Sequence, residues 1–353
     1  MSAGGERIVS VDYVKAISIF LVLLSHTAIP VGLSVWISEF HVPLFFFASG
    51  FLFSFSRNPR TMTFAKKRAR QLLVPFVWLD IVSYVFWLLA GRNYGADAGL
   101  SLSWYRPLVC SLSGDTDGMV HNLSLWFFPS LFLTGCCCHV VMKWLSDYGG
   151  RTGRSGLPYS VSIGLPAAFL IVGWAVYELM GNIRLFIGQS LVMSAFYVSG
   201  HVFRCFSEGH SFVSKPRLVF FGMAALLLTL CGTSLNDKVT VYNNYYGTYP
   251  LFVVFALSGI SLMVVAGVVM SRVFGENRVV RLISDNTLLI CGLHLMFFSI
   301  IKGVLFFLFG ITTDIFSDAI VPNLLLSLAA IAFCLPVAVG IRRCLPWLIG
   351  VKR

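Results

Sequence analysis

Several ionisable residues lie inside apolar stretches of this chain, where they could take part in chemistry. Lys15 and His26 both fall in the first such stretch and are eleven residues apart. At 100° per residue, this spacing brings the two side chains to one face of a helix, about 16 Å apart along its axis. Because an ionisable group in a membrane span costs roughly 2.5–3.5 kcal/mol on insertion scales, each is a candidate for function. The alternative is a lysine that extends to the membrane surface and an interfacial histidine, with no shared role.

Two further histidines are expected at the depth of His26, and a third lies within a later span. His41 begins the second apolar stretch, His121 begins the fourth, and Glu39 lies beside His41. A single interfacial histidine is usually an anchor, but His26, His41 and His121 are expected at one depth, which favours a polar site. His294 falls near the middle of the ninth stretch and is expected to face the interior of the bundle.

The densest run of charge is Lys66-Lys67-Arg68-Ala69-Arg70. It can serve as a topology anchor on the cytoplasmic side, or it can bind a polyphosphate, because Lys and Arg supply charge and donors to phosphate oxygens. The sequence contains no glycine-rich phosphate loop, so a nucleotide would not be held by a glycine cradle. No metal is expected, since the consecutive positions of Cys136-Cys137-Cys138-His139 point in different directions from a helix.

The composition indicates what positions these residues. The 353 residues are 57% hydrophobic and 12% charged, which excludes a soluble enzyme. Long apolar stretches without alternation predict an all-α, polytopic membrane bundle of about ten transmembrane helices, forming a single membrane-embedded domain over residues 1–353. Asp12 and Lys15 interrupt the first stretch, which is therefore expected to be a retained span and not a signal peptide. The predicted spans are Val9–Pro30, Phe40–Ser56, Gln71–Ala90, Asn122–Leu145, Pro158–Met180, Ile183–Phe203, Arg217–Gly232, Thr248–Val273, Leu282–Phe309 and Ala319–Ile341.

The basic residues orient this predicted bundle. With ten spans, 20 of the 26 Lys and Arg residues fall on the side of the N-terminus, including Arg151, Arg154, Lys352 and Arg353, and five fall on the other side. This asymmetry predicts that both termini are cytoplasmic. Because the charges lie in short loops beside spans, the basic composition does not indicate a nucleic-acid partner. The five residues assigned to the far side are Arg92, Arg106, Arg184, Lys238 and Lys302.

The stretch from Arg7 to Phe76 resembles the acyltransferase 3 family of bacterial membrane O-acyltransferases, and in particular its fucose 4-O-acetylase-like branch. Lys15-x10-His26 matches the first-helix motif of the family, and Lys67-x-x-Arg70 stands where members often carry Arg-x-x-Arg. The stretch around Trp126 is similar to a later tryptophan motif, and Asn286 to His294 is similar to a late helix. The other matching segments are Asp12-Tyr13-Val14-Lys15, Phe40 to Phe51, and Leu72-Leu73-Val74-Pro75-Phe76.

This resemblance implies transfer of an acyl group, usually acetyl, from cytoplasmic acetyl-CoA to a sugar hydroxyl of a lipid-linked or surface glycan in a bacterial inner membrane. His26 is then the predicted general base or acyl carrier, since imidazole can do either near neutral pH. Lys15 is assigned to the catalytic pair, and the basic run is assigned to the donor. The predicted donor-binding residues are Lys67, Arg68 and Arg70, and the predicted acceptor-binding residues are Glu39, His41, His121, Trp126 and His294.

Two other functions are open from the sequence. A glycolipid or polysaccharide-precursor transporter would also need polar residues inside a bundle, although such folds often show matched broken helices in their two halves. Glycine and proline occur inside the spans here without such matched pairs. A sensor or scaffold without chemistry has no sequence feature in its favour.

Overall fold

The computed structural model describes residues 7–94, 102–149, 159–181, 183–207 and 215–351. Pro158, the first residue of the fifth predicted span, lies outside the described residues. So do Arg151, Arg154, Lys352 and Arg353 from the count of basic residues.

The described regular structure is helical, apart from one isolated bridge between Thr240 and Tyr245. Ten long helices coincide with the ten predicted segments, and a short helix, α5 (Arg106–Ser113), follows α3. Continuous apolar sequence favours helices in lipid because each helix satisfies its own backbone groups. The ten are α1 (Val9–Ser25), α2 (Val31–Phe51), α3 (Thr61–Phe86), α6 (Phe127–Gly149), α7 (Tyr159–Met180), α8 (Ile187–Ser207), α9 (Lys215–Leu235), α10 (Tyr249–Phe274), α11 (Arg278–Phe309) and α12 (Ile320–Cys344).

Seven of these helices are long and apolar enough to cross a membrane: α2, α3, α6, α9, α10, α11 and α12. The chain is therefore a multi-pass membrane protein built as a helical bundle. Helices α1, α7 and α8 complete the ten, and ten crossings with cytoplasmic termini stay a prediction.

Two helices begin well before the predicted spans. Helix α2 begins at Val31 instead of Phe40, and the polar residues Ser34, Ser38 and Glu39 of its first turns are buried inside the bundle. Helix α3 begins at Thr61 instead of Gln71, so the basic run forms the first turns of the helix instead of a loop. In both places, hydropathy alone underestimated the length of the helix.

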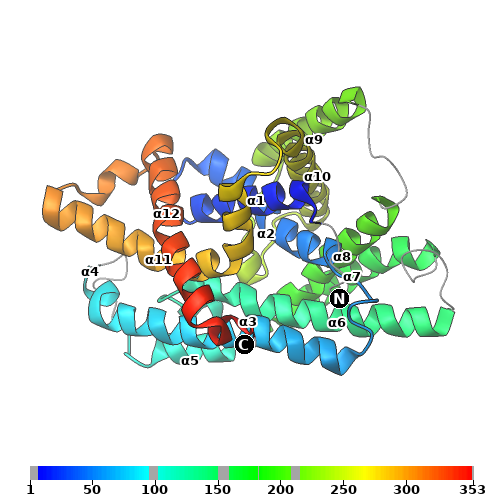
Figure 1. The fold of residues 1–353 in the computed structure, drawn as a ribbon, viewed down its shortest axis with the longest axis horizontal. Coiled ribbons are helices and arrows are strands. Elements are labelled where there is room, and N and C mark those ends of the chain that lie inside the picture. The colour runs from blue at the N-terminus through cyan, green and yellow to red at the C-terminus, as the bar shows by residue number, and fades with distance from the viewer. Residues whose placement is uncertain (1–6, 95–101, 150–158, 182, 208–214, 352–353) are drawn as a thin grey trace.

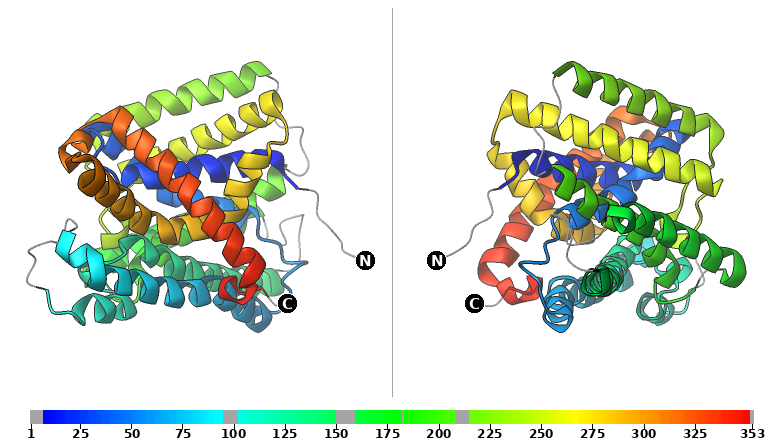
Figure 2. Two further views of the ribbon diagram at one scale, coloured as in Figure 1. Left: turned by 60° about the vertical axis from the view of Figure 1, so that its left-hand side comes forward. Right: turned by 90° about the vertical axis from the view of Figure 1, so that its right-hand side faces the viewer.

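Helix α1 lies near the centre of the bundle, where it packs against α2, α10, α11 and α12. The two views of Figure 2 show α9 and α10 along one edge and α3 and α6 along the opposite edge, with α1 between them. Helices α11 and α12 pair with each other, and α7 packs on α8 (Figure 1). Because α1 has neighbours on all sides, its polar face can be aimed at an interior space.

Helices α2 and α8 approach each other at two glycines. A β-carbon at Gly50 would lie 1.8 Å from the carbonyl oxygen of Tyr197, and one at Gly200 would lie 2.0 Å from that of Phe47. Small residues at a helix crossing allow this close backbone approach. The two helices are thereby locked side by side.

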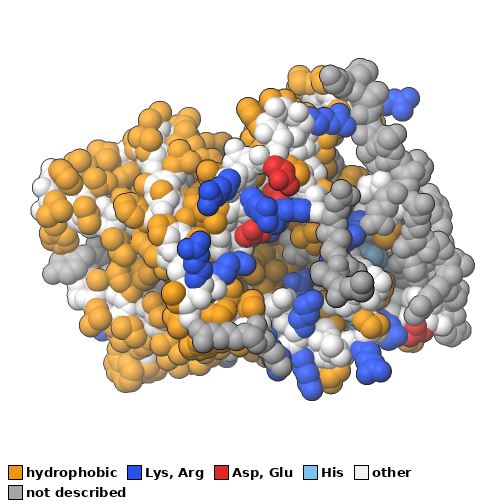
Figure 3. Space-filling model, in the orientation of Figure 1, with side chains coloured by type: hydrophobic (Ala, Val, Ile, Leu, Met, Phe, Trp, Pro, Cys, Tyr) orange, Lys and Arg blue, Asp and Glu red, His pale blue; other side chains and the backbone are white. Residues whose placement is uncertain are grey.

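The start of α1 and the end of α12 lie at the same end of the bundle. Arg7 forms ion pairs with Asp12 (2.6 Å) and with Asp285 at the start of α11 (3.0 Å). From the end of α12, Arg342 donates to the backbone carbonyl of Asp285 and to the side chain of Asn286. Figure 3 shows Lys and Arg side chains gathered beside a hollow on this side of the molecule, while hydrophobic side chains cover the part formed by α11 and α12. We call this the basic end, and the end at which α1 terminates the distal end.

Candidate functional site

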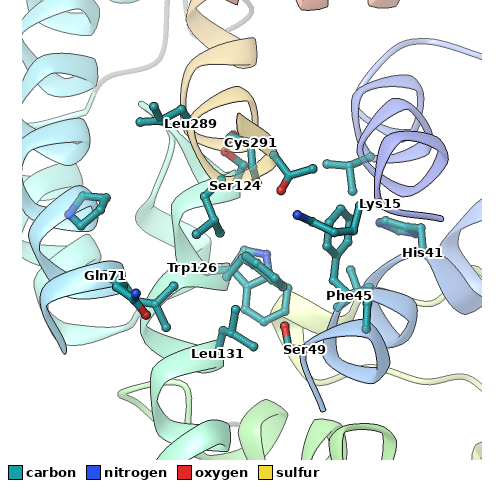
Figure 4. A pocket seen from close by; sticks show the side chains of 18 of the residues that line it. Lys15, His41, Phe45, Ser49, Gln71, Ser124, Trp126, Leu131, Leu289 and Cys291 are labelled. Carbon is teal, nitrogen blue, oxygen red and sulfur yellow. Dashed lines mark hydrogen bonds between the residues drawn. The ribbon is translucent and has the colours of Figure 1, made fainter. Parts of the chain in front are cut away.

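A cavity of about 680 Å³ lies in the interior of the bundle. Its walls come from α1, α2, α3, α11 and the end of α12, from the turn that precedes α6, and from the loop between α9 and α10. In Figure 4 the labelled side chains from these elements point toward one another across this space. Six of the residues predicted for the site line the cavity: Lys15, His26, His41, Lys67, Arg68 and Trp126.

His26 follows the last turn of α1 and lines the cavity at the distal end. Its Nδ1 lies 2.7 Å from the carbonyl oxygen of Val22. A carbonyl only accepts hydrogen bonds, so Nδ1 carries the proton and the neutral ring keeps its lone pair on Nε2. The backbone of α1 thus holds one nitrogen of the ring and leaves the other as a base.

His41 is arranged in the same way on α2. Its Nδ1 lies 2.7 Å from the carbonyl oxygen of Ile37, which again places the lone pair on Nε2. The imidazoles of His26 and His41 therefore come from two consecutive helices and line one cavity. Figure 4 shows His41 among the side chains of this cavity wall.

Lys15 lines the cavity nearer the basic end and donates to the backbone carbonyl of Ser284 on α11. The hydroxyl of Ser284 in turn donates to Asp12 at 2.6 Å. These contacts hold the ammonium group between α1 and α11. With three helical turns between Lys15 and His26, the two groups serve different parts of the cavity and do not act on one atom.

One face of α3 carries the basic wall. Lys67, Arg68 and Gln71 line the cavity, and the guanidinium of Arg68 lies 5.6 Å from the centre of the Phe64 ring. Positions 64, 67, 68 and 71 follow the spacing of a single helical face. Arg70 is exposed and lies outside the cavity lining. Of the two residue pairs at this spacing, both Arg68 and Gln71 line the cavity, whereas only Lys67 of the pair Lys67–Arg70 does.

Trp126 closes a short 3₁₀ turn, Leu123–Trp126, that leads into α6. Its indole lines the cavity and is almost fully buried. In Figure 4 the ring lies opposite Phe45 and Lys15. A flat aromatic surface with one polar edge suits the apolar face of a sugar ring or an acyl chain.

His294 is buried beside His26 and does not line the cavity. Its ring is 5.0 Å from that of His26, centre to centre, at 71° between the planes. Nδ1 lies 2.7 Å from the carbonyl oxygen of Cys291, while the buried Nε2 has no hydrogen-bond partner. The prediction that His294 faces the interior agrees with this position, and its contact is with His26.

Glu39 and His121 are also buried away from the cavity lining. Neither carboxylate oxygen of Glu39 has a hydrogen-bond partner, and a β-carbon at Gly232 of α9 would lie 2.3 Å from one of them. Glu39 therefore faces α9. His121 instead bonds to Asp80 of α3 at 2.8 Å, and Asp80 also accepts from Ser111 of α5 at 2.6 Å.

The cavity wall also contains residues that the sequence had not singled out as site residues. Asp285, Asn286 and Arg342 meet at the basic end, and Lys238 lies on the loop between α9 and α10. Asn286 begins the late-helix motif, which was a usable signal. Arg342 and Lys238 were counted only as topology charges, since nothing in their spacing indicates that they reach the cavity.

Comparisons with known proteins agree with these features. The model of the acyltransferase 3 family, described as an acyltransferase domain, matches residues 8–343. No curated protein and no solved structure gives a significant match. The matched segment extends from the start of α1 to the end of α12 and includes every wall of the cavity except its last residues, Ile349 and Val351. The chain therefore belongs to the acyltransferase 3 family and is a multi-pass membrane acyltransferase.

Proposed function

We propose that this acyltransferase moves an acetyl group from acetyl-CoA to a sugar hydroxyl of a lipid-linked or surface glycan. The observation that carries the proposal is the orientation of His26. Its Nδ1 is bonded to the backbone and its Nε2 is left as a base in the wall of a cavity that extends from the basic end to the distal end.

In the proposed reaction, the acceptor hydroxyl oxygen attacks the carbonyl carbon of the thioester. A C–O bond forms, and the hydroxyl proton passes to Nε2 of His26. The tetrahedral intermediate then collapses with cleavage of the C–S bond, and the proton on His26 passes to the sulfur of coenzyme A. Alternatively, Nε2 attacks the thioester first, and the C–S bond breaks to release the coenzyme A thiolate. The acceptor hydroxyl then attacks the acetyl group on His26, the C–N bond breaks, and the hydroxyl proton is taken up by the thiolate. This route needs the same free lone pair.

The donor would enter at the basic end. Lys67 and Arg68 are available there for phosphate oxygens, with Arg342 on the opposite wall. Lys15 lies between this end and His26 and already donates to a backbone carbonyl, so it would guide the polar arm of the donor past α1. The linear arm of coenzyme A would then carry the thioester toward the distal end.

The acceptor would enter at the distal end, where Ser34, Ser38 and His41 line the cavity. Hydroxyl and imidazole groups pair with sugar hydroxyls, and Trp126 offers a face for a sugar ring. A glycan acceptor, a fucose 4-O-acetylase-like specificity and a bacterial inner-membrane location all belong to this proposal. They rest on the resemblance of the N-terminal motifs, together with this lining.

Two measurements test the proposal. Surface glycans from cells with and without the protein should differ by acetyl groups in mass analysis. Purified protein should release coenzyme A from acetyl-CoA over many turnovers only when a glycan acceptor is present. Unchanged glycan masses would exclude this acceptor class, and glycolipid transport without release of coenzyme A would favour a transporter.

A further inference from the structure

The loop between α9 and α10, Asn236–Thr248, forms a fixed wall of the cavity at the distal end. The backbone N–H of Val239 donates to the hydroxyl of Ser38 on α2 at 3.2 Å. The carbonyl of Tyr242 accepts from the side chain of Gln189 on α8 at 2.6 Å. These bonds attach the loop to the starts of two helices, so its side chains have defined positions over the cavity.

Lys238 is the cation of this loop, and it lines the cavity. Its neighbour Val239 bonds to Ser38, one helical turn before His41 on α2, and Lys238 lines the same cavity as His26 and His41. The neighbouring Asp237 does not line the cavity, and it accepts a hydrogen bond from the hydroxyl of Tyr245 at 3.0 Å. The acid next to Lys238 is therefore directed elsewhere.

The other charges of the cavity lining lie toward the basic end. Among the described lining residues, the only acid is Asp285, which is paired with Arg7 at the basic end. His26 and His41 present uncharged Nε2 lone pairs at the distal end. Lys238 is thus a positive charge without an acid opposite it, beside the proposed base. The remaining cations of the lining are Lys15, Arg57, Lys67, Arg68 and Arg342.

We propose that Lys238 selects an acceptor that carries a negative charge, a carboxylate or phosphate group on the glycan, close to the hydroxyl that is acylated. This inference rests on the proposed function, since it assigns the charge of the acceptor at the same site. The hydroxyl groups of Ser34, Ser38 and Thr240 line the cavity around Lys238 and His41 and would pair with the sugar. The anion would lie at Lys238 while the reacting hydroxyl points to His26.

The test measures binding separately from turnover. A panel of short oligosaccharides is prepared with a carboxylate and as the methyl esters, which differ only in charge. Titration calorimetry with the purified full-length protein gives Kd, and release of coenzyme A from acetyl-CoA gives kcat and KM. A glycosyl phosphate and its neutral glycoside form a second arm, which distinguishes a phosphate source of the charge from a carboxylate source.

The variants are Lys238→Met, Lys238→Arg and the control Lys302→Met. Lys302 was also assigned to the non-cytoplasmic side but lies over the ring of Phe316, outside the cavity lining. We expect charged members to bind about tenfold more tightly than their neutral forms, as for a hydrogen bond to a charged group. This preference should disappear in Lys238→Met and persist in Lys238→Arg and Lys302→Met.

Two results would overturn the inference. The first is that charged and neutral oligosaccharides bind the unmodified protein equally well. The second is that Lys238→Met weakens the binding of charged and neutral oligosaccharides by the same factor. The second result would assign Lys238 to the chemistry or to the folding of the loop. Charge-selective binding without release of coenzyme A would instead leave the Lys238 subsite in place and refute the proposed acyl transfer.

Discussion

Two histidines of this protein, His26 and His121, differ in what surrounds their second nitrogen. His26 bonds to a backbone carbonyl through Nδ1, which leaves the lone pair on Nε2, and the residue lines the cavity. His121 bonds through Nε2 to Asp80 in a fully buried network, and its Nδ1 is enclosed without a partner. An imidazole can take a substrate proton only where its lone pair meets open space. The first arrangement suits chemistry and the second joins α3 to the segment before α6.

Of the substitutions that test this difference, His26→Ala should cause the largest loss of activity. Removal of the base is expected to lower kcat by about 10²–10⁴ while the protein stays folded. Thr27→Ala is the matched control, because Thr27 also bonds to the backbone of α1 but does not line the cavity. Rates of coenzyme A release from purified variants give the measurement. Near-normal turnover in His26→Ala would remove it from the chemistry.

His121→Ala should act on stability instead. It leaves the carboxylate of Asp80 buried with only Ser111 as a partner, which costs roughly 3–5 kcal/mol when a buried pair is broken. We expect a clearly lower Tm in detergent, and a smaller loss when Asp80→Asn is added to it, because the unpaired charge is then gone. A His121→Ala variant with unchanged Tm and lost turnover would place His121 in the site after all.

His294→Gln should have a moderate effect, confined to kcat. The His294 ring packs edge-on against His26 and would orient it, so we expect about a tenfold lower kcat with little change in KM. The loss should vanish when His26 is already Ala, since there is then no ring to orient. Additive losses in the His26→Ala, His294→Gln double variant would argue for an independent role.

The smallest expected effects concern the basic run, where substitutions should distinguish residues that line the cavity from residues that do not. Lys67→Ala and Arg68→Ala should each raise KM for acetyl-CoA by about threefold to tenfold, the range of a partly exposed charge contact. Lys66→Ala serves as the control, because Lys66 is exposed on the same helix and does not line the cavity. Arg70→Ala tests whether the Lys67-x-x-Arg70 motif or the cavity lining identifies the donor-binding residues. We expect Arg70→Ala to leave KM unchanged, as Lys66→Ala does. An increase in KM as large as that of Lys67→Ala would favour the motif.

Much of this arrangement was predictable from the sequence. Apolar stretches identified the ten long helices, and the spacing of Lys15 and His26 predicted that they share one helix face; the structure places both in the lining of one cavity. The predicted span missed the first nine residues of α2, which include Ser34, Ser38 and Glu39, although the whole of Val31–Phe51 is apolar enough to cross a membrane.

Depth alone also misled the grouping of the polar residues. His121 and Glu39 were expected beside His26, yet His121 bonds to Asp80 from the turn before α6, and Glu39 faces α9 from its side of α2. The directions of these two side chains depend on contacts between segments that are distant in the sequence. Lys238 and Arg342 reach the cavity for the same reason, through loop and helix positions that no local spacing encodes.

The glycine crossing of α2 and α8 limits how substrates can enter. With backbone in contact with backbone at Gly50 and Gly200, neither helix can slide by a turn past the other without a collision. The wall that carries His41 is therefore expected to stay in place, and any gate would have to be formed by other elements around the cavity. Substrate exchange would then leave the position of His41 relative to α8 unchanged.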